Sequence, residues 1–201
     1  MNLAVLASGS GSNLQAIIDA AEKGALDGTV KTVISDKIEA FALQRARKHG
    51  IEALYLNPRD FSCREDYDQS ICALLEERKI GLIALAGFMR LLSPVFVRRY
   101  PGQIMNIHPS LLPAFPGLDG VKQALEYGVK VSGCTVHFVD EGLDTGPIIL
   151  QEAIPVLETD DEETLHQRIH QVEHRLYPRA ISLFMRGRLT VKGRRCIVDE
   201  S

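Results

Sequence analysis

Apolar runs of strand length alternate with helical patterns through the first half of the chain, and this alternation constrains the fold most. The first run, residues 2–7, ends at glycines and is followed by Leu14, Ile17 and Ile18 at helical spacing. Further strand-like runs cover residues 29–35, 51–56, 80–86 and 103–107, and helical patterns cover residues 39–48 and 64–79. Strands that alternate with helices indicate a parallel sheet with right-handed crossovers and helices on both faces.

The second half has a different pattern. Residues 132–139 alternate in the manner of a strand, and residues 148–156 form another strand that can return antiparallel to it. Apolar residues at helical spacing then predict a long helix over residues 160–185. We therefore predict one α/β domain over residues 1–201, with a doubly wound, mostly parallel, Rossmann-like sheet, a late antiparallel strand and a long C-terminal helix.

The charge balance excludes some classes of ligand. The 201 residues, a length typical of one domain, include 26 acidic and 23 basic side chains, for a net charge of −3. Such a balance argues against nucleic acid as the main ligand, which requires a net basic face. A basic cluster near the C-terminus is interpreted as a solvated edge strand and tail: Arg186, Arg188, Lys192, Arg194 and Arg195.

The sequence shows no feature of a membrane or secreted protein. The longest apolar stretch, residues 81–88, is far shorter than the roughly 18 residues of a transmembrane helix. The N-terminus lacks the positively charged region of a signal peptide. The four cysteines show no C-x-x-C spacing, which favours reduced thiols. We therefore expect a cytoplasmic protein with no membrane contact.

A glycine-rich turn, GSGSN at residues 9–13, separates the first strand from the first helix. Backbone amides at a helix start, together with the positive end of its dipole, can bind a phosphate. Leu14 stands where a dinucleotide-binding fingerprint requires glycine, and the Lys-Ser/Thr of a Walker A loop is absent. The alternative is an ordinary turn in which Ser12 or Asn13 caps the helix.

The densest group of polar residues is NIHPSLLP at residues 106–113. Strand alternation places Asn106 and His108 on one side, at the carboxyl end of a strand, where doubly wound sheets bind ligands. An amide donor beside an imidazole suits a reaction that develops negative charge on oxygen. The alternative is a structural histidine beside a proline turn.

Two further groups could contribute to chemistry. The acidic loop DEGLD at residues 140–144 could bring a carboxylate to the imidazole and raise its pKa, although most such loops are solvated turns. His166, His170 and His174 recur every four residues beside Glu173, a spacing that can bind a metal. Without further ligands, a polar helix face is the favoured interpretation.

Together these segments resemble the phosphoribosylglycinamide formyltransferases of the folate-dependent formyltransferase superfamily. The resemblance spans nearly the whole chain and rests on four stretches: SGSGSNLQA at 8–16, LAGFMRLL at 85–92, NIHPSLLP at 106–113 and VDEGLDTGP at 139–147. The Asn-x-His-Pro-Ser-Leu-Leu-Pro stretch marks the superfamily, and its combination with the glycine loop is specific to this member. Asp119 departs from the pattern, since some members have histidine there.

The resemblance implies a role for each group of residues. The catalytic set would be Asn106, His108 and Asp144. The glycinamide ribonucleotide would be bound through its phosphate by Gly11, Ser12 and Asn13, and through its ribose by Glu173. The folate would be bound by Arg64, Met89, Arg90, Leu91, Leu92, Asn106, Asp140, Glu141, Gly142 and Leu143.

The implied reaction transfers a formyl group from 10-formyltetrahydrofolate, a co-substrate, to the primary amine of 5′-phosphoribosylglycinamide in de novo purine biosynthesis. Asn106 and a protonated His108 would stabilise the oxyanion of a tetrahedral intermediate. Asp144 would raise the pKa of His108. The implied partners are these small molecules alone, without metal, nucleic acid or membrane, and a homodimer stays open.

Three alternatives share part of this pattern. A formyltetrahydrofolate deformylase would use the same residues with water as the nucleophile, usually with an extra N-terminal domain. A methionyl-tRNA formyltransferase shares the HPSLLP run but carries a further C-terminal domain. A non-enzymatic phosphate-binding module of flavodoxin-like shape would explain the glycine loop but not the catalytic set.

Overall fold

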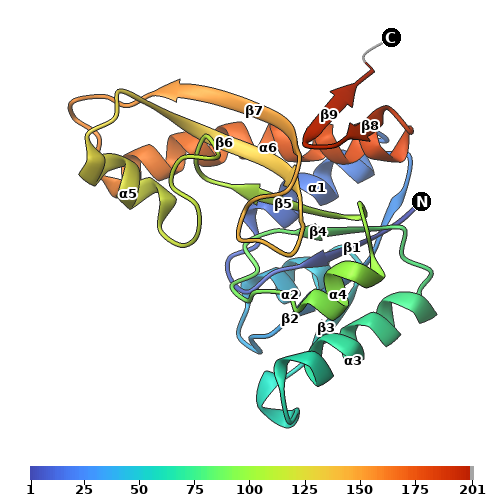
Figure 1. The fold of residues 1–201 in the computed structure, drawn as a ribbon. Coiled ribbons are helices and arrows are strands. Elements are labelled where there is room, and N and C mark those ends of the chain that lie inside the picture. The colour runs from blue at the N-terminus through green and yellow to red at the C-terminus, as the bar shows by residue number, and fades with distance from the viewer. Residues whose placement is uncertain (200–201) are drawn as a thin grey trace. The chain divides into compact units, whose positions relative to one another are not determined.

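A computed structural model describes residues 1–199 as two compact units, Met1–Met105 and a second unit from Asn106 onward. Along the chain, Figure 1 shows the alternation of strands and helices that the sequence predicts for the first unit. Strand β5 (Ile104–His108) contains the boundary, so that its last three residues belong to the second unit.

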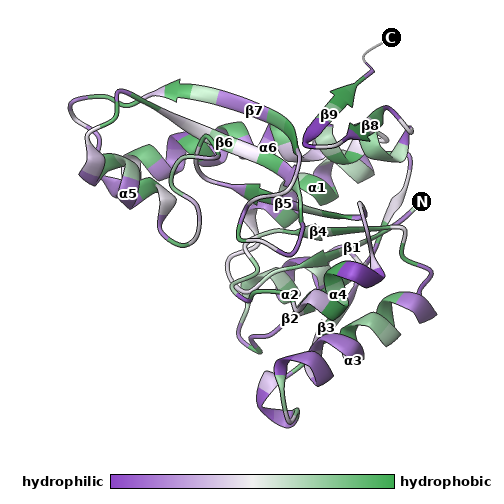
Figure 2. Cartoon of the chain, in the orientation of Figure 1, coloured by the Kyte–Doolittle hydropathy of each residue, from purple (hydrophilic) through white to green (hydrophobic). Residues whose placement is uncertain are grey.

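The first unit contains a parallel sheet. Its strands are β1 (Asn2–Leu6), β2 (Thr29–Ser35), β3 (Glu52–Tyr55) and β4 (Leu82–Leu85), in the order β3-β2-β1-β4. All of these pairings are parallel, and residues 3–6 of β1 and all of β4 are fully or almost fully buried. Figure 2 shows both strands as hydrophobic along most of their length. Strands buried on both faces read as continuous apolar runs, as here.

Five helical segments accompany these strands. They are α1 (Ser12–Glu22), α2 (Phe41–Lys48), the short 3₁₀ segment Pro58–Asp60, α3 (Arg64–Glu77) and α4 (Pro94–Arg99). Ser93 begins α4 by accepting a hydrogen bond from the Phe96 amide, with Pro94 at the first helical position. Neither α4 nor the 3₁₀ segment was predicted, because both are too short for helical periodicity to show.

The second unit is built around an antiparallel pair, β6 (Val131–Phe138) and β7 (Ile148–Pro155). The long helix α6 (Glu162–Met185) packs along both strands (Figure 1). Asp161 and Thr164 form a capping box at its start. The late antiparallel strand and the long helix were both predicted, whereas the short helix α5 (Gly120–Tyr127) was not.

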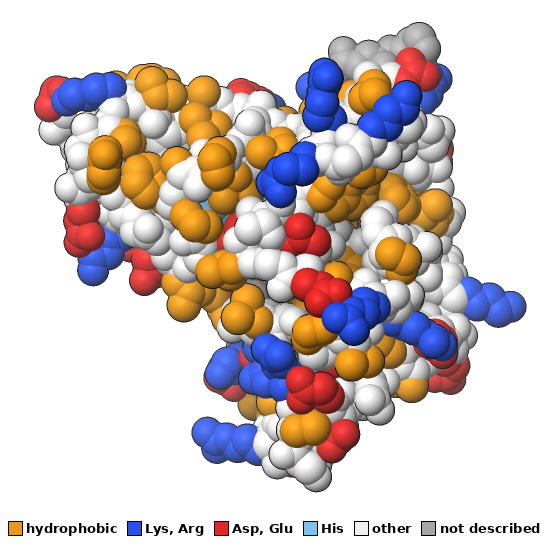
Figure 3. Space-filling view, in the orientation of Figure 1, with side chains coloured by type: hydrophobic (Ala, Val, Ile, Leu, Met, Phe, Trp, Pro, Cys, Tyr) orange, Lys and Arg blue, Asp and Glu red, His pale blue; other side chains and the backbone are white. Residues whose placement is uncertain are grey.

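The basic cluster forms a hairpin, β8 (Leu189–Lys192) and β9 (Arg195–Val198). Strand β9 pairs with β7, which leaves β8 at the edge of the strand order β6-β7-β9-β8. The predicted edge strand is therefore confirmed, and Figure 3 shows Lys and Arg side chains exposed around this hairpin. None of the helices within residues 1–199 is both long and apolar enough to cross a membrane.

Candidate active site

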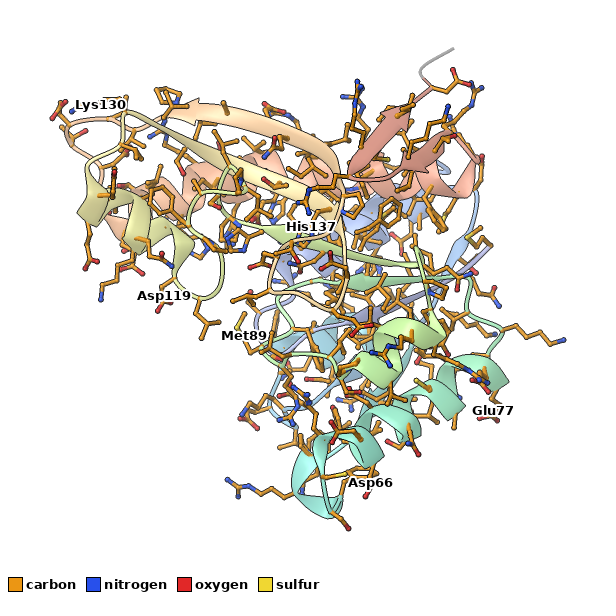
Figure 4. The ribbon with its side chains drawn as sticks, in the orientation of Figure 1. Asp66, Glu77, Met89, Asp119, Lys130 and His137 are labelled. Carbon is orange, nitrogen blue, oxygen red and sulfur yellow. The ribbon has the colours of Figure 1, made fainter. Side chains whose placement is uncertain are left out.

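Asn106 and His108 lie on the same side of β5, as strand alternation predicts, and both reach Asp144. The Asn106 Nδ2 atom lies 3.5 Å from Asp144 Oδ1, and His108 Nδ1 lies 3.6 Å from Asp144 Oδ2. A fourth side chain, His137 of β6, places its Nε2 atom 3.2 Å from Asn106 Nδ2 and 3.6 Å from Asp144 Oδ1. We refer to these four side chains as the polar cluster; Figure 4 labels His137.

Asp144 is held by its backbone and by a neighbouring amide. Its φ of 53° lies in the left-handed region, which non-glycine residues seldom adopt. The Gly117 amide donates a 2.7 Å hydrogen bond to Asp144 Oδ2. The side chain is 11% exposed, so the carboxylate sits in the low-dielectric surroundings where its contacts with two imidazoles are strongest.

The His108 ring is fixed by a backbone carbonyl. Its Nε2 atom donates to the Phe115 oxygen at 2.7 Å, which leaves Nδ1 directed at Asp144. A Cβ atom on Gly120 would lie 3.2 Å from that oxygen and 3.3 Å from His108 Nε2. Glycine at this position therefore lets the segment after Phe115 approach the ring closely.

Burial decides the charge state of His108. Loss of water lowers the pKa of His108 below its ordinary value, although the Phe115 carbonyl and the Asp144 charge act in the opposite direction. The expected effect of Asp144 is present but smaller than that of burial, so the expectation of a raised pKa is wrong. At neutral pH the ring of the free protein is mainly neutral.

Asp144 itself titrates low. Burial alone would raise the pKa of Asp144, but the contact with His137, the hydrogen bond from the Gly117 amide and the electrostatic effect of the His108 ring lower it. The polar cluster therefore carries one carboxylate flanked by two histidines. Such an arrangement can accept a proton on a ring and keep the resulting cation paired.

The rest of the acidic loop is folded around Asp140. Its Oδ1 atom accepts hydrogen bonds from the Gly142 amide at 3.0 Å and the Thr145 hydroxyl at 2.6 Å. Glu141 is exposed, and the Leu143 side chain is 49% exposed. The loop thus presents an apolar side chain and a carboxylate next to the residue that contacts His108.

The first unit places Gly11 at the start of α1, with φ of 70° and no side-chain cap. The alternative in which Ser12 or Asn13 caps the helix is therefore wrong, because both already lie inside it. A Cβ atom on Gly11 would lie 2.8 Å from the Ala42 Cα atom. Only glycine fits this close approach and this backbone conformation, and the helix start is free of its own capping side chain.

The other predicted residues of the first unit are Arg64, the first residue of α3, and residues 89–92, which follow β4. Arg64 begins that helix and pairs with Glu65 at 3.6 Å, while the Arg90 guanidinium lies 5.0 Å from the centre of the Tyr67 ring. Met89, labelled in Figure 4, and Leu91 are 64% and 62% exposed. The adjacent Leu92 is half-buried.

Glu173 lies on α6 and is only 3% exposed. Its Oε2 atom is 3.7 Å from His170 Nε2. Burial, followed by the charge of Glu173, raises the pKa of Cys134 to about 12. A carboxylate this deeply buried calls for polar partners, and it lies on the helix that packs along β6 and β7.

The sequence profile described as Formyl transferase matches residues 1–181, which includes the whole polar cluster. The chain belongs to the formyl transferase family. It is 49% identical over 189 residues to the phosphoribosylglycinamide formyltransferase of Escherichia coli, a match covering 94% of this chain and 89% of that protein.

Two further proteins are similar to this chain. A glycinamide ribonucleotide transformylase structure from Symbiobacterium toebii superposes with a TM-score of 0.97 at 51% identity, covering 98% of this chain and 93% of that one. The trifunctional purine biosynthetic protein adenosine-3 of Drosophila melanogaster is 54% identical over 92% of this chain, which spans only 14% of that protein's length.

Three groups of the site were not predicted from the sequence: His137, the Phe115 carbonyl and the Gly117 amide. The signal for His137 was present, since one imidazole stands within the apolar alternation of residues 132–139. The two backbone groups carry no sequence signal. The rings of His166 and His170 on α6 are tilted at 46° with centroids 4.0 Å apart, and those of His170 and His174 are stacked with centroids 5.8 Å apart. No metal-binding group of three His, Cys, Asp or Glu side chains occurs within residues 1–199.

Proposed function

We propose that this chain is a phosphoribosylglycinamide formyltransferase, which moves the formyl group of 10-formyltetrahydrofolate to the primary amine of 5′-phosphoribosylglycinamide in de novo purine biosynthesis. The observation that carries the proposal is the polar cluster, which joins an amide donor, an imidazole and a carboxylate in a family of formyl transferases. The names of the relatives from Escherichia coli and Symbiobacterium toebii support the choice of substrates.

In the proposed reaction, the amine lone pair attacks the formyl carbon, and a new C–N bond forms while the carbonyl oxygen becomes negative. The Asn106 amide donates a hydrogen bond to that oxygen. Collapse of the intermediate breaks the bond between the formyl carbon and N10 of the folate. The amine loses one proton and N10 gains one, so the reaction consumes no water and needs no covalent enzyme intermediate.

His108 and Asp144 would carry that proton. The neutral ring of the free protein can take a proton at Nδ1, the atom that faces Asp144 at 3.6 Å. The carboxylate stabilises the imidazolium that results. The charged ring then stands beside the oxyanion before it releases the proton to N10. A ring with a low pKa thus gains its charge during the reaction, rather than before it.

Substrate binding is proposed for both units. The helix start at Gly11, Ser12 and Asn13 would hold the nucleotide phosphate, because it offers backbone amides and the positive end of the α1 dipole. Glu173 would accept hydrogen bonds from the ribose hydroxyls.

The folate would contact both apolar and charged side chains. In the first unit these are the exposed Met89 and Leu91 with Arg64, Arg90 and Leu92; in the second they are Asp140, Glu141, Gly142 and Leu143, with Asn106. Exposed apolar side chains suit a flat heterocycle. We further propose that the two units act as one formyltransferase domain in the cytoplasm. Whether the chain forms a homodimer is a separate question, which analytical sedimentation would answer.

The test is an assay with both substrates, following release of tetrahydrofolate and formation of the formylated nucleotide. We expect the two products in equal amounts, and no folate release without the nucleotide. Release that ignores the nucleotide would instead identify a deformylase. Activity after treatment with a strong chelator should be unchanged, and stoichiometric zinc lost together with activity would contradict the metal-free reaction.

A further inference from the structure

We infer that His137 is a positioning residue that orients the Asn106 amide toward the reacting oxygen. The inference rests on the proposed function for the meaning of that oxygen, but the contacts themselves do not depend on it. His137 lies at the end of β6, is 1% exposed and contacts two members of the polar cluster. None of the steps proposed above uses it.

The hydrogen-bond partners of His137 determine its tautomer. The ring Nδ1 atom lies 2.8 Å from the Phe138 carbonyl oxygen. A carbonyl oxygen can only accept, so Nδ1 carries the hydrogen, and in the neutral ring Nε2 is an acceptor. That atom faces Asn106 Nδ2 at 3.2 Å. The buried imidazole therefore accepts a hydrogen bond from the Asn106 amide.

The acceptor on His137 determines which way round the Asn106 amide nitrogen and oxygen lie. The two Asn106 Nδ2 hydrogens are directed at His137 Nε2 and at Asp144 Oδ1, 3.2 Å and 3.5 Å away. Rotating the amide by half a turn would point the Asn106 oxygen at His137 Nε2 and Asp144 Oδ1. All three atoms are acceptors, so none of these contacts would then contain a hydrogen. The direct distance between His137 and Asp144, 3.6 Å, is too long for a hydrogen bond.

The two hydrogen bonds that the Asn106 amide donates differ in strength. The contact with Asp144 is at the limit of hydrogen-bond length, whereas the one with His137 is shorter. When an oxyanion forms, the weaker contact can be exchanged while the His137 contact keeps the amide plane in place. The effect is specific to the transition state, so loss of His137 lowers kcat more than it raises KM.

The experiment compares two substitutions at the same buried position. His137→Gln keeps an acceptor oxygen for the amide, whereas His137→Leu does not. We expect His137→Leu to lower kcat about tenfold, a cost in the range for misplacing a reacting group, with KM for both substrates nearly unchanged. His137→Gln should retain most of the wild-type kcat. Equal kcat in both variants would overturn the inference, because the acceptor would then be irrelevant.

A double substitution separates positioning from independent catalysis. In an Asn106→Ala background, His137→Leu should change kcat by less than about twofold, because the group that it orients is already gone. Effects that multiply would instead show that His137 acts by itself, which contradicts the inference. Thermal unfolding of each variant identifies losses caused by destabilisation, and His137→Met replaces the leucine variant if that one does not fold, since a thioether is a weak acceptor.

A measurement on the free protein keeps this inference separable from the proposed function. The side-chain amide signals of Asn106, followed by ¹⁵N NMR without substrates, should shift in His137→Leu and stay close to wild type in His137→Gln. Unshifted signals in His137→Leu would overturn the inference even if the formyl transfer is confirmed. Conversely, a wild-type protein without formyl transfer refutes the proposed function and leaves the NMR result interpretable.

Discussion

The glycine loop of the first unit, residues 9–13, and the polar cluster of the second unit hold their groups in opposite ways. The loop depends on backbone fit: Gly11 has a positive φ, and Ala42 leaves no space for a Cβ atom. The polar cluster depends on side chains that contact one another, two of them buried histidines, and two backbone groups complete it. The glycine loop therefore depends on its backbone conformation, and the polar cluster depends on titratable side chains.

The two sites should tolerate different kinds of substitution. A backbone site should respond to added volume and remain insensitive to pH, because no member changes its charge near neutrality. A cluster of histidines and a carboxylate should tolerate isosteric changes sterically and respond through charge and hydrogen-bond direction. The following substitutions test this contrast, beginning with the largest expected effect.

Removing the Asn106 amide should cause the largest loss. Asn106→Ala deletes the donor for the oxyanion, and such a deletion lowers turnover by about a hundredfold or more. The affinity for folate should fall much less. Steady-state kinetics with both substrates, together with folate titration, measure the two effects. A mild loss of kcat combined with loss of folate binding would make Asn106 a binding residue.

Asp144→Asn should change the pH dependence of activity. The Asp144 charge opposes the burial that lowers the pKa of His108, so removing that charge lowers the pKa further. A ring with a lower pKa accepts the amine proton less readily, since each unit of decrease is about a tenfold loss of proton affinity. We expect turnover at neutral pH to fall by about tenfold, because the imidazolium formed in the reaction loses its paired charge, and we expect the remaining activity to extend to lower pH than in the wild type.

The sign of this effect is fixed by the direction of the shift. The neutral ring that accepts the proton is present above its pKa and is lost as the pH falls through it, so the acid limb of the variant lies at lower pH than that of the wild type. NMR titration of the His108 ring measures both values directly. A pKa that is equal or higher in Asp144→Asn would show that the pair is not coupled.

The two sites also differ in how far the sequence could predict them. Gly11 was identifiable because a glycine between a strand and a helix marks a tight turn, and Asn106 and His108 because strand alternation places them together. The role of Asp144 came from the family resemblance. The low pKa of His108 could not be predicted, since it depends on burial by segments distant in the chain. The Phe115 and Gly117 backbone groups were hidden for a related reason, because every residue carries such groups and only the fold selects among them.

Gly11→Ala tests the backbone site with a matched control. Its Cβ atom would meet the Ala42 backbone, while Gly24 has nearly the same φ, 71°, and no atom within 4 Å of an added Cβ. We expect Gly11→Ala to weaken binding of the nucleotide about tenfold, the effect of losing one well-placed phosphate contact. Gly24→Ala should carry the conformational strain alone and bind normally. Calorimetric titration compares them, and equal affinities would place the phosphate elsewhere.

The smallest effect is expected at the hairpin, where Arg194 Nη2 donates to the Thr145 carbonyl oxygen at 3.0 Å. Thr145 follows Asp144 and also donates to Asp140, so Arg194 supports the strained turn that aims the carboxylate. An exposed hydrogen bond contributes little, and Arg194→Ala should lower kcat by about twofold to threefold. Arg195→Ala, the neighbouring change with the same loss of charge, should leave kcat unchanged. Equal losses in both variants, abolished by salt, would indicate that the hairpin acts through its charge alone and not through the turn that carries Asp144.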